Sequence, residues 1–167
     1  MNTRIGLVEE WVNFERYFWS NCKPLLILSA DFINQVLSAY QSPAVGLGQA
    51  LYQDSLTYGI DDAPALAFFQ HESTFGRYGF AALTHSLGNV VCAGYPHCSG
   101  RFRWYASWQE GAYDWFHVLS TEYLPRGLST VEKIIPVYAP TSENNVSAYI
   151  AAVNSAVAAW RAGRILV

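Results

Sequence analysis

The sequence predicts an α+β domain that is mainly helical and carries one small β-hairpin beside a loop-rich cleft. Apolar residues recur at helical spacing in several segments after residue 29, and most of these segments follow a residue that can cap a helix. Gly, Ser, Thr and Asn concentrate between Gly76 and Gly100, where a helix is unfavourable. The length of 167 residues, with 51% hydrophobic and 14% charged residues, favours one globular domain with a sizeable core.

The first 28 residues are expected to form an arm, and residues 29–167 the domain itself. Apolar residues of the arm lie near helical spacing at Ile5, Val8 and Val12, so the arm is either helical or extended and docked on the domain. Pro24 ends any helix in this segment, because proline cannot continue one.

Two helices are predicted at the start of the domain. Ser29 is the expected N-cap of a helix over residues 30–40. Ser42, as a cap, and Pro43, in the first turn, predict the start of a second helix. That helix is expected to stop near Gly59, since glycine readily adopts the left-handed conformation that closes a helix.

The third predicted helix follows Asp61 or Asp62, either of which can cap it, and it ends near Glu72. Its apolar residues lie on all sides: Ala63, Ala65, Leu66, Ala67, Phe68 and Phe69. A helix without a polar face is expected to be buried in the centre of the domain.

The hairpin is predicted from two short strands, Val90–Cys92 and Arg101–Tyr105, which pair across a Gly- and Pro-containing loop. Cys92 and Cys98 flank that loop, and they either form a disulfide or remain two free thiols. A ring of this size stabilises a fold by about 2 kcal/mol on the loop-entropy account. Cys22 has no obvious partner.

Three further helices are predicted toward the C-terminus. Two of them begin at Ser-x-x-Glu capping boxes, in which each side chain bonds a free backbone N–H of the first turn. The boxes are Ser107/Glu110, for a helix reaching about Tyr123, and Ser129/Glu132, for a short helix that ends before Pro136. The last helix is expected to start at Ser142 and to carry Tyr149 and Trp160 on its apolar face.

Composition excludes several kinds of partner. The net charge of −3 gives no electrostatic basis for binding nucleic acid or an anionic membrane. No apolar run approaches the roughly 20 residues of a membrane span, and no signal peptide is visible at the N-terminus.

Six Trp, eleven Tyr and nine Phe must fill much of the core, and any surplus beside a polar cleft would suit stacking on sugar rings.

No metal or cofactor is predicted. His71-Glu72 does not begin an HExxH zinc motif, because Phe75 occupies the position of the second histidine. Cys92, His97 and Cys98 lack the paired spacing of a structural zinc site. Neither a Gly-x-Ser-x-Gly nucleophile elbow nor a phosphate-binding glycine loop is present.

Glu72 is the strongest candidate for chemistry. It follows Phe68 and Phe69 by four and three residues, so their rings are its neighbours on the helix surface. Burial among apolar groups and the negative end of a helix dipole both raise the pKa of a carboxyl group, and a protonated carboxyl can donate to a leaving oxygen. The alternative is a structural glutamate that accepts hydrogen bonds from loop amides such as those of residues 86–89.

Four segments resemble motifs of the bacterial peptidoglycan endo-β-N-acetylglucosaminidases, a family of the lysozyme-like superfamily that also includes goose-type lysozymes and lytic transglycosylases. AFFQHESTFG, from Ala67 to Gly76, resembles the family's A-x-x-x-x-E-S-x-x-G segment, and THSLGN, from Thr84 to Asn89, its N-x-x-G-N/I loop. FRWYASWQEG, from Phe102 to Gly111, is similar to F-R-x-Y-x-S-x-x-E, and Tyr138-Ala139-Pro140 with Tyr149 and Ile150 to Y-A-x-D…Y.

The resemblance implies a lysozyme-like fold and a monomeric bacterial cell-wall glycosidase that cleaves β-1,4-linked amino-sugar glycans of peptidoglycan. Its place of action would be extracellular or in the cell envelope. Glu72 matches the general acid, and Tyr138 matches a tyrosine that positions substrate or water. Ser86 and Asn89 match positions that hold the N-acetyl sugar or the acid, and the remaining substrate-binding residues would be Trp104, Tyr105 and Tyr149.

The sequence departs from the family at the second carboxylate, which many members place on the hairpin. Residues 90–105 contain no Asp or Glu, and Pro140-Thr141 replaces the family's acid after Tyr-Ala. Glu110 and Asp114 are the nearest acids along the chain, but a helix cap and a first-turn position explain them more simply. The alternatives to a two-carboxylate hydrolase are therefore a lytic transglycosylase, substrate-assisted hydrolysis, or a weakly catalytic module that binds glycan or the cell wall.

Overall fold

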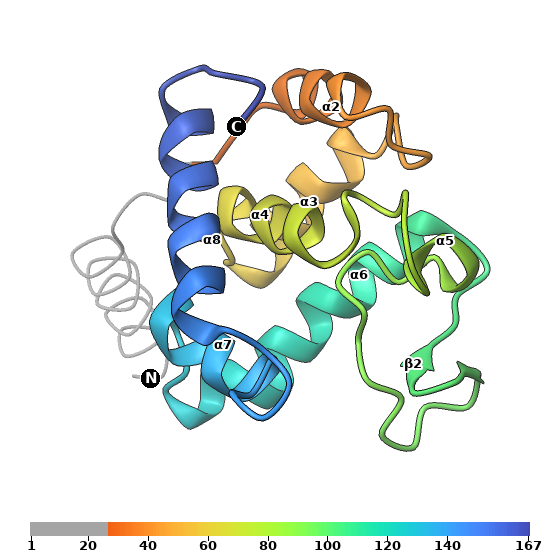
Figure 1. Cartoon of the computed structure of the whole chain (residues 1–167). Coiled ribbons are helices and arrows are strands. Elements are labelled where there is room, and N and C mark those ends of the chain that lie inside the picture. The colour runs from red at the N-terminus through yellow and green to blue at the C-terminus, as the bar shows by residue number, and fades with distance from the viewer. Residues whose placement is uncertain (1–26) are drawn as a thin grey trace, which may run out of the picture.

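The computed structural model describes residues 27–167, and the predicted N-terminal arm lies outside them except for its last two positions. The described residues form a mainly helical fold with one two-stranded antiparallel sheet, which confirms the predicted α+β, mainly helical class (Figure 1). The helices are α2 (Ala30–Ala39), α3 (Gly48–Tyr58), α4 (Asp62–Ser73), α5 (Ala81–Thr84), α6 (Trp108–Val118), α7 (Val131–Tyr138) and α8 (Val146–Arg161). The strands are β1 (Cys98–Ser99) and β2 (Phe102–Arg103).

Helix α4 lies in the middle of the fold, with α8 running beside it (Figure 1). All six apolar residues predicted to surround it are at most 1% exposed, which confirms the prediction of a central buried helix. Phe68 and Phe69 both pack on Trp115 of α6, at ring-centroid distances of 5.4 and 5.2 Å. Burying an aromatic side chain of this size contributes about 2 to 3 kcal/mol, so these rings fix the axis of α4 firmly.

The caps of the first helices are largely as predicted. The Ser29 hydroxyl accepts the Phe32 amide, the Asp61 carboxylate accepts the Ala63 amide, and Gly59 closes α3 at φ 63°. Helix α3, however, begins at Gly48 and not at Pro43. Ser42 does accept the Ala44 amide at 2.9 Å, but Gly46 is left-handed at φ 102°, so residues 43–47 form turns. The Asn34 side chain of α2 then accepts the Gly46 and Gly48 amides at the start of α3.

The segment between Gly76 and Gly100 is not entirely without helix, because α5 forms a single turn within it. The hairpin is also tighter than predicted. Strand β1 pairs with β2 around Gly100, with Cys98 opposite Arg103, and the predicted Val90–Cys92 strand contributes only one isolated bridge, from Val91 to Phe102. Glycine suits the turn because φ is +59° at this position.

The C-terminal helices confirm the predicted elements and correct two of their boundaries and both capping boxes. At the start of α6, Ser107 accepts the Glu110 amide as predicted, but Glu110 accepts the Ala106 amide and not that of Ser107. A π-helical turn (Leu119–Tyr123) and a 3₁₀ turn (Leu124–Arg126) then continue α6. The predicted Ser129/Glu132 box does not form, since α7 starts after Thr130 and Glu132 accepts from Asn154 of α8.

Two boundaries of these helices differ from the prediction. Pro136 lies inside α7 and does not end it, which costs the helix one backbone hydrogen bond on an exposed face. Helix α8 starts at Val146 and not at Ser142, because the Asn145 side chain caps it by accepting the Ala148 amide at 3.0 Å. The expected buried positions Tyr149 and Trp160 are 2% and 1% exposed.

Candidate active site

Glu72 lies in the last turn of α4, where the helix meets the loop that leads to the hairpin. The helix ends because Thr74 adopts a left-handed conformation at φ 48°. Ser73 ties this end to the loop, since its hydroxyl donates to the Leu87 carbonyl and accepts the Gly76 amide, both at 2.8 Å. The central helix therefore positions the acid, and Ser73 fixes the loop beside it.

Two neutral donors hold the Glu72 carboxylate. The Tyr149 hydroxyl of α8 donates to Oε1 at 2.7 Å, and the Asn89 side-chain amide donates to Oε2 at 3.2 Å. Among residues 27–167, no lysine, arginine or histidine forms an ion pair with this carboxylate. Burial raises the pKa of Glu72, and the two hydrogen bonds lower it by less. The side chain thus favours the protonated form to a higher pH than an exposed glutamate does.

Asn89 joins the loop to the acid twice. Its amide nitrogen also reaches the Glu72 carbonyl oxygen at 3.1 Å, and its backbone N–H closes a turn onto Ser86. The backbone is left-handed, at φ 51°, a conformation that asparagine tolerates better than most residues. Its Oδ1 is buried and has no hydrogen-bond partner among the described residues. Of the two roles that the resemblance implies for Asn89, contact with the acid is visible here.

Tyr138 holds the same loop through a hydrogen bond to its backbone. Its hydroxyl donates to the Gly88 carbonyl and accepts from Trp115 Nε1 at 3.1 Å. Burial, and next the nearby Glu72 carboxylate, keep the pKa of Tyr138 well above its usual value, so the phenol stays protonated. A side chain on Gly88 would collide with both partners, because a Cβ there would lie 2.7 Å from Trp115 Nε1 and 2.8 Å from the Tyr138 hydroxyl.

His71 was not singled out by sequence reasoning, although it stands next to Glu72. Its ring stacks on Tyr149 with centroids 3.7 Å apart and an angle of 23° between the planes. Its other side borders a pocket of 390 Å³ between α4 and α8, lined also by Gln70 and Ala152. Burial lowers the pKa of His71, so the ring is neutral at pH 7 and braces Tyr149 without adding a charge.

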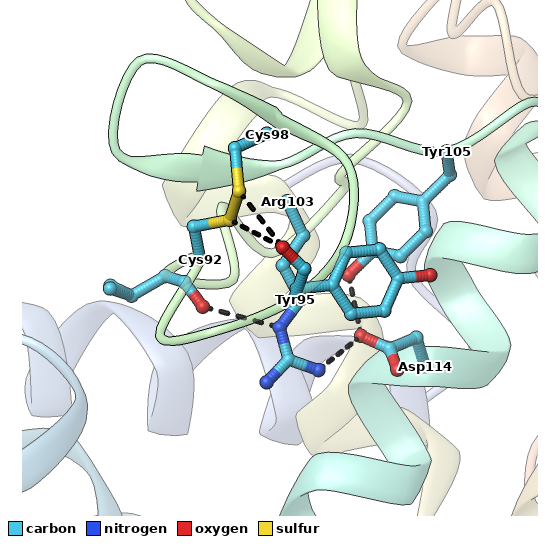
Figure 2. Close-up of a disulfide and its surroundings, with 7 residues drawn as sticks. Cys92, Tyr95, Cys98, Arg103, Tyr105 and Asp114 are labelled. Carbon is cyan, nitrogen blue, oxygen red and sulfur yellow. Dashed lines mark hydrogen bonds and ion pairs between the residues drawn. A yellow bond between two sulfur atoms is a disulfide. The ribbon is translucent and has the colours of Figure 1, made fainter.

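The two candidates for a second acid have structural partners. Glu110 serves the capping of α6, as described above, and is exposed. Asp114 lies in the middle of α6, not in its first turn, and accepts from Arg103 Nη1 at 2.9 Å and from the Tyr105 hydroxyl at 2.5 Å (Figure 2). The hairpin therefore supplies a cation to Asp114 and no carboxylate to the surroundings of Glu72.

A disulfide joins Cys92 and Cys98, whose Cα atoms are 5.9 Å apart. It closes the loop that carries Tyr95, and the Tyr95 ring lies against Arg103, with 4.9 Å between the guanidinium carbon and the ring centroid (Figure 2). The same ring packs on Tyr105 at 5.5 Å. The disulfide loop is thus part of one cluster with Asp114, which packs the hairpin onto α6.

The remaining predicted substrate-binding residues are distributed unevenly. Ser86 is fully buried, and its hydroxyl accepts the Val90 amide at 2.9 Å, so it shapes the loop. Tyr105 is 2% exposed and belongs to the Asp114 cluster. Trp104 is 39% exposed and is therefore accessible to a ligand. Tyr149 contacts the acid through its hydroxyl. Of the predicted substrate-binding residues, only Asn89 and Tyr149 form hydrogen bonds with the Glu72 carboxylate.

The arrangement of these residues can donate a proton. Residues 27–167 contain no group of three or more His, Cys, Asp or Glu side chains placed to hold a metal ion. No helix in that part of the chain is both long and apolar enough to cross a bilayer. What the site offers is a carboxyl group with a raised pKa, held in place by a phenol and an amide.

Comparison with known proteins adds no family assignment, since no protein-family model and no curated protein sequence matches the chain.

Proposed function

We propose that the protein is a glycosidase that cleaves β-1,4 linkages of peptidoglycan or a related amino-sugar glycan, with Glu72 as the general acid. The observation that carries the proposal is the setting of Glu72: a carboxyl at the end of a buried helix, with a raised pKa and only neutral hydrogen-bond donors. The resemblance of four sequence segments to the glucosaminidases supports the choice of substrate.

In the proposed reaction, protonated Glu72 gives its proton to the glycosidic oxygen as the bond from that oxygen to C1 of the sugar breaks. Tyr149 and Asn89 then stabilise the carboxylate that remains, because both donate hydrogen bonds to its oxygens. Tyr138 contributes indirectly, by holding the Gly88 carbonyl and so the loop that presents Asn89.

The positive charge that develops at C1 needs a second group, and the surroundings favour one that belongs to the substrate. Residues 90–105 contain no carboxylate, and Asp114 is bound to Arg103. We therefore propose that the acetamido oxygen of the sugar bonds to C1 as the glycosidic bond breaks, and that water then displaces this oxygen and gives a proton to the Glu72 carboxylate. Alternatively, a hydroxyl of the same sugar bonds to C1, gives its proton to Glu72 and leaves an anhydro product. The second route makes the protein a lytic transglycosylase.

Digestion of purified peptidoglycan by wild type and Glu72→Gln tests the proposal. We expect Glu72→Gln to lower the rate by about 10²- to 10⁴-fold, which is the usual contribution of a general acid. Glu132→Gln is the matched control: it removes an exposed carboxylate on α7, keeps an oxygen that can accept from Asn154, and should leave the rate unchanged. Glu110→Gln should also retain the rate if Glu110 serves only as a cap.

Mass spectrometry of the products separates the outcomes. New reducing ends indicate hydrolysis, and anhydro-sugars indicate the lytic route. Equal turnover by wild type and Glu72→Gln would remove the proposed role of Glu72. Binding of peptidoglycan by wild type with neither product released would instead indicate a binding module.

A further inference from the structure

Charge is distributed unevenly along the chain. Residues 73–109, here called the acid-free segment, contain no Asp or Glu, and their only Lys or Arg residues are Arg77, Arg101 and Arg103. The other residues hold all thirteen acids and only seven Lys and Arg. The segment that follows Glu72 and forms the loop and hairpin is therefore positive within a protein of net charge −3. The acids that pair with these arginines therefore come from other elements, as Asp114 and Glu143 do.

Arg101 is the arginine of this segment that remains accessible. Arg103 is buried against Asp114, and Arg77 donates to the Tyr40 carbonyl at 3.0 Å. The Arg101 side chain is 56% exposed, and its guanidinium carbon lies 5.5 Å from the centroid of the Phe102 ring. Contact with a ring face orients the guanidinium while leaving its N–H groups free to bind an anion.

Arg101 is also connected to the acid through the backbone. The Cys92 amide donates to the Arg101 carbonyl, and the Arg103 amide to the Val90 carbonyl, both at 2.8 Å. The short segment that starts at Asn89, which contacts Glu72, thus runs outward beside Arg101. We call this segment together with the hairpin, residues 89–103, the loop–hairpin wall, and Arg101 belongs to it.

On the outer end of this wall, Arg101 forms an ion pair with Glu143 at 2.8 Å. Glu143 lies in the turn before α8, the helix whose Tyr149 holds the other oxygen of Glu72. In Figure 1 the α7–α8 connection and β2 lie toward the same end of the molecule. The loop–hairpin wall and helix α8 are therefore connected twice. Asn89 of the wall and Tyr149 of α8 both donate to Glu72, and the Arg101–Glu143 pair connects the wall to the turn before α8.

We propose that Arg101 determines specificity for carboxylate-bearing glycans by exchanging Glu143 for a carboxylate of the substrate. This proposal rests on the proposed function and deepens it. In this proposal the glycan that reaches Glu72 runs along the loop–hairpin wall, where its carboxylate competes with Glu143 for Arg101. An ion pair this exposed contributes little to stability, and its opening is correspondingly easy. The freed guanidinium then binds a carboxylate on the lactyl or peptide substituent of the polymer, in the fork geometry that arginine favours.

Binding measurements with turnover removed test this proposal. In a Glu72→Gln background, titration calorimetry compares a soluble peptidoglycan fragment that carries peptide carboxylates with a neutral chitooligosaccharide of the same number of sugars. We expect Arg101→Gln to weaken binding of the charged fragment about 10-fold, and binding of the neutral one less than 2-fold. Glu143→Gln should tighten binding of the charged fragment about 2-fold, because it releases Arg101 in advance.

Arg77→Gln is the matched control, since it removes the same charge from the same segment without touching the Glu143 pair. It should change either affinity by less than 2-fold. Equal losses for charged and neutral fragments in Arg101→Gln, an equal loss in Arg77→Gln, or no binding of either fragment would each overturn the proposal. Cleavage is measured separately on wild type, so a protein that selects the charged fragment but releases no product would contradict the proposed function alone.

Discussion

The surroundings of Glu72 and of Asp114 show two ways of holding a carboxylate on a buried helix. Each carboxylate accepts a hydrogen bond from a tyrosine, Tyr149 at 2.7 Å and Tyr105 at 2.5 Å. The difference is the second partner. Glu72 has a neutral amide, whereas Asp114 has the Arg103 guanidinium at 2.9 Å. A neighbouring cation favours the ionised form, so its absence leaves Glu72 able to carry a proton.

Asp114→Asn should have the largest effect on stability. It leaves Arg103, whose side chain is only 10% exposed, with Glu122 at 3.7 Å as its remaining acidic partner. Breaking a buried pair by removing one member leaves an uncompensated charge, and we expect the free energy of unfolding to fall by about 3 kcal/mol. Urea denaturation at pH 7 measures this loss. Glu122→Gln, which removes the longer and exposed contact, should cost less than about 0.5 kcal/mol.

Tyr149→Phe should shift the pH dependence of activity. The hydrogen bond from Tyr149 lowers the pKa of Glu72, so its removal raises that pKa further. Because the protonated form is the proposed acid, the fall of kcat/KM at high pH should move upward by the same amount. The carboxyl band in infrared titration reports the same pKa without turnover.

The matched variant for this test is Tyr105→Phe, which removes the equivalent hydroxyl from Asp114. It should leave the pH at which kcat/KM falls unchanged. A similar shift in both variants would contradict the distinction between the two carboxylates.

Glu72→Gln should change stability less than Asp114→Asn does, and in the opposite direction. The folded protein binds the Glu72 proton more tightly than the unfolded chain does, so stability falls as pH rises between the two pKa values. Removing the charge should therefore stabilise the protein at pH 7. The gain should disappear below about pH 3, where the side chain is protonated in both states because the ordinary pKa of glutamate is about 4.3. Thermal unfolding at the two pH values measures it, and a loss of stability at pH 7 would contradict the raised pKa.

The features predicted best from sequence depend on residues close together in the chain. The burial of α4 followed from apolar residues on all its faces, and the Ser29 and Asp61 caps from their positions before apolar runs. The start of α3 was wrong, and it depends on a more distant partner. The Asn34 side chain accepts the Gly46 and Gly48 amides, 12 and 14 residues away, and no pattern around Ser42 indicates this.

The same limit applies to the candidate site. The position of Glu72 at the end of an apolar helix could be predicted, and the resemblance pointed to Asn89 and Tyr149 as members of the site. The bond from Tyr149 to Glu72 spans 77 residues, so no local pattern encodes it. The Arg103–Asp114 pair joins a strand to a helix, and the stacking of His71 on Tyr149 joins two helices. Both depend on how the elements pack.

The disulfide between Cys92 and Cys98 changes what a protease could do to the hairpin. The residues between the two cysteines include exposed Ala93, Gly94, Pro96 and His97, and exposed loops of small residues are the usual sites of cleavage. A single cut there would leave both new ends attached through the sulfur atoms. Glu72, before the loop, and Arg101 and Arg103, after it, would stay in one covalent molecule. Nicked protein should therefore separate into two fragments only after the disulfide is reduced.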